Sequence, residues 1–316
     1  MRSAIFSLLL LLAPAANGGL IVNEYNAVGS TRWLDSNNAA GSTASDTTFG
    51  RVQGNGGNWI ELVVTSDHMD VRNWELWWYE NDAAATGAEI WDPTRTLAGV
   101  DAQGKIVFSN DDFWSDLRQG TILTITEQSS ISTVNAQGQA VVLDLSTNLG
   151  FSPHFGDWHV NVSTLQEASA AAPLLTTISN LTTYVPGSFS VGNDNWEILV
   201  VDALGIVQQG PVGEAYGGFG GLNSREVGKL EFPAAPATFE DWQSIGNTGY
   251  KGGSSSSFGQ PNLWSSGTFV QDFGPLRTEA IPEASSLVMM LSRGSEELPS
   301  SVVSGLPTRG ARKVMA

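Results

Sequence analysis

The chain of 316 residues contains no cysteine. A disulfide framework is therefore excluded, and stability has to come from an apolar core of ordinary size. Sites that depend on thiolates are excluded as well, both structural zinc sites with cysteine ligands and cysteine nucleophiles.

Basic residues are also scarce. Lys and Arg number 15 against 32 Asp and Glu, which gives a formal net charge of −17. Nucleic-acid binding normally needs Lys and Arg clustered on one face, and no such cluster occurs before the extreme C-terminus, so we expect no nucleic-acid partner. The acidic excess favours solubility, and it permits binding of cations such as calcium without indicating it.

Long hydrophobic runs are missing too. The run Ala4–Leu12, interrupted only by Ser7, is too short for a membrane-spanning helix, which needs about 20 residues. With Arg2 before it and Ala13-Pro14-Ala15 after it, the run has the three regions of a secretory signal peptide. The alternative is a buried N-terminal helix or strand. We expect residues 1–18 to be removed, the mature chain to be secreted or at the cell surface, and no stable membrane insertion after cleavage.

Helical patterning is nearly absent, whereas strand-like runs recur between clusters of Gly, Asn, Asp and Ser. This pattern is typical of an all-β sandwich or barrel of antiparallel strands with long loops. One short helix is expected within Asn161–Leu181, and a helical turn at Asp112-Phe113-Trp114. Strands are expected at Gly19–Ala27, Trp59–Thr65, Trp74–Tyr79, Lys105–Ser109, Gly120–Thr126, Ala140–Leu145, Trp158–Val162, Trp196–Val201, Ile206–Gln209 and Val227–Phe232.

We expect residues 19–277 to form the folded domain. The blocks Trp59–Val64 and Trp196–Val201 echo each other, so one enlarged sandwich and a duplicated one are both open. Thr31–Asn58 lacks periodicity and is expected to be a long surface loop. Pro233–Gly267 is rich in Gly and Ser but carries aromatics, which predicts irregular wrapping rather than a linker. Residues 278–316 contain no aromatic side chain and are expected to be a disordered tail.

Several short motifs follow one another between residues 19 and 262. An apolar strand ending in Asn23-Glu24 opens the series, and a hairpin with Gly205 at its turn stands near its end. The full series is Leu20–Tyr25, Asn58–Leu62, Val71–Leu76, Lys105–Phe108, Gly120–Thr124, Val200–Val207 and Ser257–Asn262.

In this order the motifs resemble those of lamin-tail domains found in secreted bacterial proteins. The resemblance implies an immunoglobulin-like β-sandwich that serves as a binding or structural module and not as an enzyme. Asn73 stands where the family usually has Gly, and Phe258 where it has Pro. The chain is also longer than such domains, and the excess lies near Glu127–Asn195, which we interpret as an insertion.

Glu24 and Glu61 lie on two of the expected strands. We expect both to be solvated carboxylates. The alternative is partial burial, with ties to backbone N–H groups or to Arg72.

A second resemblance lies in the tail. Ile281-Pro282-Glu283 resembles the start of the PEP-CTERM sorting signal of exported bacterial proteins, with Ala284 in place of the expected Pro. That signal continues into a transmembrane helix, whereas the apolar run here is limited to Leu287–Leu291. The motif is therefore interpreted as a degenerate sorting signal, and a misread C-terminus and coincidence stay open as alternatives.

The three histidines are His68, His154 and His159. His154 and His159 flank Asp157, but the chain contains neither a G-x-S-x-G nucleophile elbow nor an H-E-x-x-H zinc motif. We expect loop histidines that are exposed or half-buried, and no catalytic residue.

The candidate calcium ligands are Asp111, Asp112 and Asp194. They occur in two Asn/Asp clusters, and neither cluster has the D-x-[DN]-x-[DN]-G spacing that arranges side chains around one ion. Turn formation explains them as well. We expect no cofactor, with calcium left open.

Tryptophan is frequent, with 11 residues. Trp77-Trp78-Tyr79 is the best candidate for a sugar-stacking platform, because neighbouring strand residues point to opposite faces and one or two of the rings should face away from the core. The alternative is that both sheet faces are covered.

These observations favour an exported, non-catalytic module that acts in adhesion, in the extracellular matrix or in cell-surface structure. Its partner would be an extracellular polysaccharide or a surface protein. The alternative is a carbohydrate-binding, lectin-like module that uses Trp77, Trp78 and Tyr79.

Overall fold

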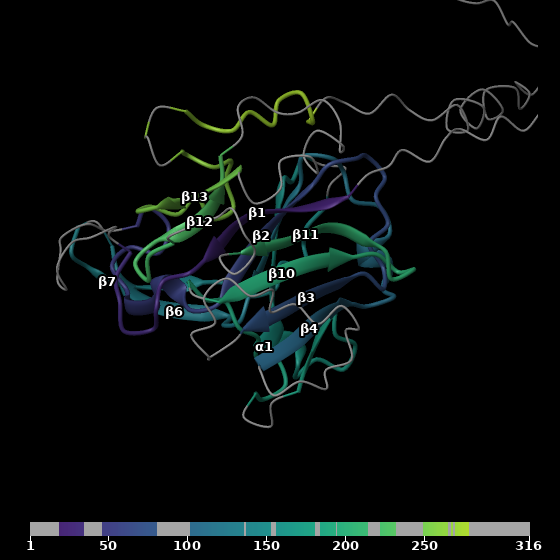
Figure 1. Cartoon of the computed structure of the whole chain (residues 1–316), viewed down its shortest axis with the longest axis horizontal. Helices are drawn as coiled ribbons and strands as arrows, with labels where there is room; N and C mark the ends of the chain where they lie inside the picture. Colours follow the sequence, from purple (N-terminus) through teal and green to yellow (C-terminus); the bar gives the residue numbers. More distant parts are fainter. Residues whose placement is uncertain are drawn as a thin grey trace, which may run out of the picture. The chain divides into compact units, whose positions relative to one another are not determined.

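The computed structural model in Figure 1 describes residues 19–34, 46–80, 102–135, 137–152, 156–180, 184–193, 195–213, 222–231, 249–264, 267 and 269–277. The expected signal peptide at 1–18, the tail with Ile281, Pro282 and Glu283, and the residues His154 and Asp194 lie outside this set.

The larger sheet has six strands, in the order β13-β12-β1-β2-β5-β8. Neighbouring strands are antiparallel except β5 and β8, which run parallel. The strands are β1 (Leu20–Asn26), β2 (Trp59–Val64), β5 (Ile122–Thr126), β8 (His159–Ser163), β12 (Val227–Leu230) and β13 (Tyr250–Gly253).

The second sheet has five antiparallel strands, in the order β11-β10-β3-β4-β9. They are β3 (Glu75–Glu80), β4 (Ala102–Phe108), β9 (Leu175–Ser179), β10 (Trp196–Val201) and β11 (Val207–Gly213). A separate hairpin consists of β6 (Ser130–Val134) and β7 (Ala140–Asp144). The short helical elements are η1 (Gln53–Gly56), η2 (Asp112–Trp114) and α1 (Thr164–Glu167).

The two sheets share one apolar core. Ile60 and Leu62 of β2 belong to the same buried cluster as Leu76 of β3 and Ile198 of β10. Tyr25 of β1 and Trp196 of β10 bring their ring centroids to 4.8 Å. The predicted all-β sandwich is therefore confirmed, and the similar blocks at Trp59 and Trp196 supply one strand to each sheet.

The ten predicted strands are all present, with ends shifted by a few residues. α1 and η2 occupy the positions expected for a short helix and a helical turn. Prediction failed for β6, β9 and β13. β9 lies inside the segment for which a helix was expected, because its run of Leu, Thr, Thr, Ile and Ser is short and follows a stretch rich in Ala.

The segment Glu127–Asn195 enlarges both sheets. Its strand β8 forms one edge of the six-stranded sheet, and its strand β9 forms one edge of the five-stranded sheet. The same segment contains the β6–β7 hairpin and α1. The extra length of the chain therefore extends the sandwich itself.

The described part of Thr31–Asn58 is irregular apart from η1 and the isolated Asp46–Gly50 bridge, as expected for a loop, but it lies only partly at the surface. Phe49 is fully buried, and its ring lies 5.7 Å from that of Trp59 and 4.9 Å from that of Phe258. These three rings form an apolar cluster on the outer face of the six-stranded sheet. The reason is that β2 has side chains on two faces, and both need apolar cover.

Tyr250 and Phe258 are buried as expected for a wrapping segment. The neighbouring aromatics Phe239 and Trp242 lie outside the described residues. Where the chain is described, none of its helices combines the length and hydropathy that crossing a bilayer requires.

Candidate functional site

A row of polar side chains crosses the outer face of the six-stranded sheet. Direct cross-strand pairing places Lys229, Glu24, Glu61, Thr124 and Asn161 side by side on β12, β1, β2, β5 and β8. Each of the five is at most 7% exposed. Because directly paired residues point to the same face of a sheet, the row is continuous over five of the six strands, from β12 to β8.

The segment Ser256–Asn262 covers this row. The backbone N–H of Ser257 donates to both carboxylate oxygens of Glu24, at 3.1 and 2.9 Å. The backbone N–H of Gly259 donates to Oε2 of Glu61 at 2.7 Å. Lys229 Nζ donates to the carbonyl oxygen of Leu263 at 2.9 Å. The two carboxylates therefore bind the backbone of the covering segment.

Amide side chains complete the arrangement. Asn23 donates to Oε1 of Glu61 at 2.7 Å. Asn262 donates to the carbonyl oxygens of Asn23 at 2.9 Å and Leu230 at 3.1 Å, and Gln271 donates to Oδ1 of Asn23 at 2.8 Å. We call this group the closure cluster; its members are Asn23, Glu24, Glu61, Lys229, Ser257, Gly259, Asn262 and Gln271.

The expectation that Glu24 and Glu61 are solvated is wrong. Both are fully buried, and their partners are backbone N–H groups and Asn23. Arg72, the other suggested partner, instead contacts Asp70 at 2.6 Å and Asp112 at 3.3 Å. Strand alternation alone could not show this, because it depends on the segment from Ser256 onward folding back over the strand face.

Burial changes the acidity of both carboxyl groups. It raises the pKa of Glu61 to about 8, against the lowering effects of the Asn23 and Gly259 hydrogen bonds and of Lys229. It also raises the pKa of Glu24 well above its ordinary value; Lys229 opposes this shift and the neighbouring Glu61 adds to it. Because neither carboxyl group reaches solvent, the pair holds the chain together rather than meeting an external substrate.

The histidines lie apart from one another in the described structure. His159 is half-buried on β8, where Nε2 lies 2.9 Å from Oγ1 of Thr124 and the ring contacts Phe258. Burial lowers the pKa of His159 to about 4. His68 is exposed and lies 2.7 Å from Asp116.

The proposed aromatic platform is not exposed. Trp77, Trp78 and Tyr79 are 6%, 1% and 7% exposed. Trp78 lies in the main core, whereas Trp77 faces the other side of its sheet and packs with Leu199 and Val201. Of the two interpretations left open by the sequence, the structure has the one in which both faces of β3 are covered, so the flat surfaces that sugar stacking needs are not accessible.

The described calcium candidates have structural partners. Asp111 caps η2, with its carboxylate accepting from the backbone N–H of Phe113 at 2.8 Å. Asp112 accepts from Arg72 at 3.3 Å. Within the described residues, no three His, Asp or Glu side chains converge as a metal site would require. Turn formation accounts for these two aspartates.

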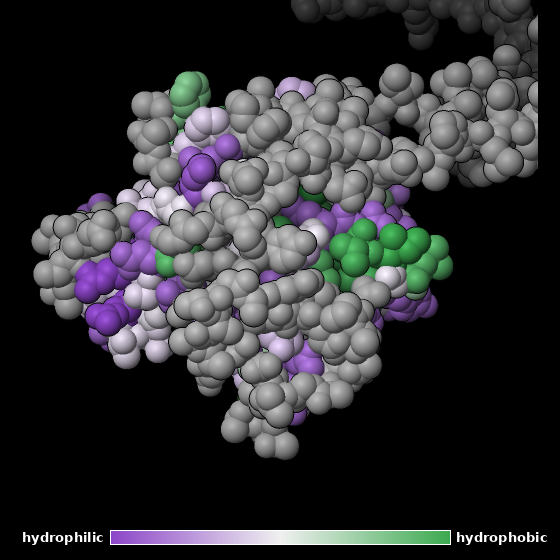
Figure 2. All heavy atoms as spheres, in the orientation of Figure 1, coloured by the Kyte–Doolittle hydropathy of each residue, from purple (hydrophilic) through white to green (hydrophobic). Residues whose placement is uncertain are grey.

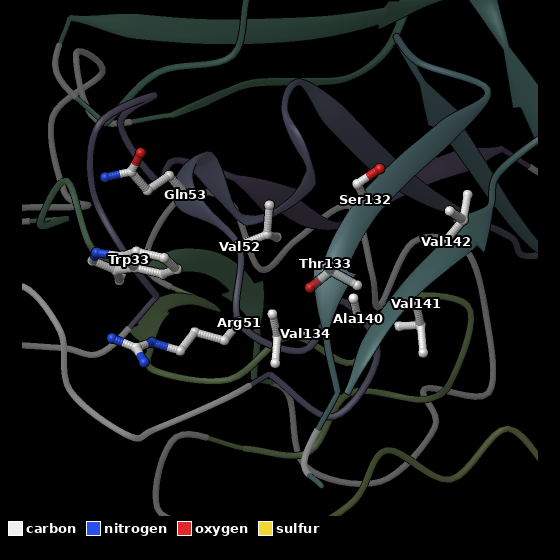
Figure 3. Close-up of a pocket in the computed structure, with 10 residues that line it drawn as sticks. All are labelled: Trp33, Arg51, Val52, Gln53, Ser132, Thr133, Val134, Ala140, Val141 and Val142. Atoms are coloured by element: carbon white, nitrogen blue, oxygen red, sulfur yellow. The ribbon is translucent and has the colours of Figure 1, made fainter. Parts of the chain in front are cut away.

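A groove with a volume of about 570 Å³ lies beside the β6–β7 hairpin (Figure 3). The Arg51 guanidinium stacks over the Trp33 ring, 4.9 Å from its centroid. The backbone N–H of Arg51 donates to the carbonyl oxygen of Val134 at 2.8 Å and ties this wall to the hairpin. The lining residues of this hairpin groove are Trp33, Arg51, Val52, Gln53, Ser132, Thr133, Val134, Ala140, Val141 and Val142.

The hairpin groove was not predicted from the sequence. Its walls come from the two ends of the first long loop, from the unpredicted strand β6 and from the predicted strand β7. One signal was present in Ala140–Leu143, a strand whose consecutive aliphatic residues do not alternate with polar ones. In the structure Val142 is 71% exposed, so part of that apolar surface is open to a ligand.

Comparison of the chain with protein-family models, with curated protein sequences and with solved structures gave no match.

Proposed function

We propose that this chain is an exported, non-catalytic β-sandwich module related to lamin-tail domains, and that it acts in adhesion, in the extracellular matrix or in cell-surface structure. The closure cluster is the observation that carries the proposal. Three motifs on which the resemblance rests, Asn23-Glu24, the strand with Glu61 and Ser257–Asn262, are joined by direct hydrogen bonds.

Short motifs that occur by chance along a chain have no reason to meet in space. Here residues more than 190 positions apart along the chain meet, since Glu61 and Gly259 are separated by 198 positions and Glu24 and Ser257 by 233. Each residue type also has a definite role: the carboxylates accept backbone N–H groups, and Gly259 occupies a left-handed conformation with φ +71°. This agreement between motif and contact supports the resemblance.

The accessible surface supports a binding role. The hairpin groove offers aliphatic and hydroxyl-bearing side chains with one aromatic ring, a composition suited to recognition of a partner. The burial of Trp77, Trp78 and Tyr79 removes the residues on which a lectin-like role would rest. An extracellular polysaccharide or a surface protein is the proposed partner class.

The proposed export is tested with the full chain in a bacterial host. N-terminal sequencing of the protein outside the cytoplasm should give a start near Gly19, and deletion of residues 2–18 should retain the chain in the cytoplasm. Equal export of the deleted form would contradict the signal-peptide prediction.

The proposed role is tested with the exported protein added to cells and to isolated extracellular polysaccharide. We expect saturable retention and no release of sugar or peptide fragments above the level of a buffer blank. Release that depends on the protein would overturn the non-catalytic assignment, and absence of retention on every surface would overturn the adhesive one.

A further inference from the structure

The turn between β10 and β11 holds large aliphatic side chains in water. Leu204 is 84% exposed, Ile206 56% and Val207 40%. We call these three residues the apolar knob. Figure 2 shows apolar side chains gathered at the end of the described structure where this turn lies. Docking against a partner removes apolar area from water, so a contiguous group of three exposed aliphatic side chains is a candidate contact surface.

The apolar knob is held rigidly. One carboxylate oxygen of Asp202 accepts the backbone N–H groups of Leu204 and Ile206, both at 2.8 Å, and the other accepts from the side chain of Gln208 at 2.7 Å. The backbone N–H of Gly205 donates to the carbonyl oxygen of Asp202 at 2.9 Å. Binding through this turn therefore orders few additional groups, which favours affinity.

The hairpin groove has matching properties. Val134, Val141 and Val142 line it and are themselves 37%, 37% and 71% exposed. Its one ionisable lining residue among those described is Arg51, a cation in a chain whose net charge is −17. The knob has the opposite charge at its base, on Asp202. The two surfaces are therefore complementary both in apolar character and in charge.

The two surfaces lie at opposite ends of the described sandwich. In Figure 1 the β6–β7 hairpin stands at the left and the end of β10 points to the right. A knob therefore does not reach the groove of its own chain. Contact between different patches on two copies is a heterologous contact, which repeats from copy to copy and produces an open chain or a closed ring.

We propose that the apolar knob of one copy docks in the hairpin groove of the next, so that copies of this protein associate head to tail. The inference concerns assembly and does not depend on export. It fills the hairpin groove with a second copy of the chain, so an outside partner would have to compete with the knob for that groove. Each copy has a net charge of −17, so repulsion between whole copies outweighs the attraction between one Arg51 and one Asp202. Association should therefore strengthen when salt rises from about 0.01 M to about 1 M, where the Debye length falls from about 30 Å to about 3 Å.

The test uses sedimentation velocity on the purified full chain and two variants. The knob variant is Leu204→Ser/Ile206→Ser, and the groove variant is Val142→Asp. All three substitutions lie at exposed positions, where effects on stability are usually small. We expect the native protein to form a concentration-dependent series of oligomers, and each variant to weaken association at least tenfold.

Mixing gives the decisive result. The knob variant keeps an intact groove and the groove variant keeps an intact knob, so the mixture should form a discrete dimer with one copy of each and no longer species. Val185→Ser, at a position 59% exposed elsewhere on the surface, should leave the oligomer series unchanged. A native protein that stays monomeric up to millimolar concentration, oligomers that survive in either variant, or a mixture without the dimer would each overturn the proposal.

Discussion

Glu24 and Glu61 place two acidic side chains in a layer that water does not reach. Each carboxylate accepts backbone N–H groups from the covering segment, and Lys229 lies on the next strand. Burial of such groups is tolerable only when hydrogen bonds replace lost hydration. Each side chain of the closure cluster therefore depends on its neighbours. Removing one donor or acceptor by substitution leaves its hydrogen-bond partner buried and unpaired.

A pH dependence follows from the raised pKa of Glu61, about 8 against an ordinary 4.5. The folded state keeps a proton that the unfolded state has already lost, so this stabilising contribution is complete below about pH 4.5 and disappears as the pH rises through about 8. We expect the free energy of unfolding in urea to fall by about 2 kcal/mol between pH 6.5 and pH 8.5.

This window lies above the range in which His159 contributes, because the pKa of His159 is about 4 in the folded state and about 6.5 in the unfolded state. Glu61→Gln should remove the part of the pH dependence that Glu61 contributes, while it retains an acceptor for the N–H of Gly259. A remainder is expected from Glu24, because burial raises its pKa too. An unchanged slope in this variant would show that Glu61 is not the group responsible.

Gly259 should tolerate no side chain. Its φ is +71°, and a Cβ atom would lie 2.6 Å from Cε1 of His159. Gly259→Ala should therefore lower the free energy of unfolding by the left-handed cost of about 1–2 kcal/mol and by a further 1–3 kcal/mol or so for the collision. Chemical denaturation measures both.

Gly138→Ala is the matched control, because Gly138 has φ +76° and open space around the Cβ position. Its free energy of unfolding should fall only by the cost of the left-handed backbone conformation. If the collision with the ring is the cause, adding His159→Ala to Gly259→Ala should recover part of the difference. Equal losses of unfolding free energy in Gly138→Ala and Gly259→Ala would contradict a collision with the His159 ring.

At the scale of elements, the covering segment acts as a brace over three strands. Ser257 and Gly259 bind β1 and β2 through Glu24 and Glu61, and Asn262 binds the backbone of β1 and β12. The strand β8 adds His159, which packs against Phe258 of the same segment. The segment thus links strands that come from distant parts of the chain.

Asn262→Ala should loosen this brace, because the carbonyl oxygens of Asn23 and Leu230 each lose a buried donor. We expect a loss of about 1–3 kcal/mol in the free energy of unfolding. Hydrogen exchange should quicken first at the ends of β1 and β12 that face the segment, and less in the five-stranded sheet.

Asn135→Ala serves as the comparison. Asn135 also makes side-chain hydrogen bonds to the backbone, accepting from Gln137 and Gln139, but at an exposed turn. Water can replace those bonds, so the loss should be smaller. A larger effect at Asn135 than at Asn262 would contradict the bracing role.

At the scale of the whole molecule, the excess of negative charge destabilises the compact folded state. The net charge is −17, and the described ion pairs, such as Arg72–Asp70 and Arg72–Asp112, are mostly near the surface. Surface pairs contribute little, generally below about 1 kcal/mol. Repulsion between the acidic side chains of the folded protein is therefore poorly compensated by ion pairs. Salt screens this repulsion and should stabilise the folded state.

Raising sodium chloride from about 0.01 M to about 1 M at pH 8 should increase the Tm by a few degrees, since about 1 kcal/mol corresponds to about 2–4 °C for a domain of this size. The measurement should use the knob variant Leu204→Ser/Ile206→Ser, so that association between copies does not contribute to the Tm. Near the isoelectric point of about 4.4 the increase should vanish. A salt effect of the same size at both pH values would exclude self-repulsion as its cause.

Sequence patterns predicted the strands well where tertiary structure supplies a regular apolar face. The strand β2 lies where it was predicted, although all six of its residues, Glu61 included, are buried. Prediction failed for β9, because a short edge strand has a weak pattern of its own. It also failed for the closure cluster, since the identity of a glutamate does not reveal what will cover it.

By itself, the sequence determined the all-β class, the positions of most strands and the absence of disulfides, because these depend on local alternation and composition. Only the tertiary structure decided that Glu24 and Glu61 are buried, that the Trp77–Tyr79 rings are covered, and that β8 joins its sheet in parallel. The physical reason is that burial and pairing depend on contacts between residues such as Glu61 and Gly259, which are 198 positions apart in the chain.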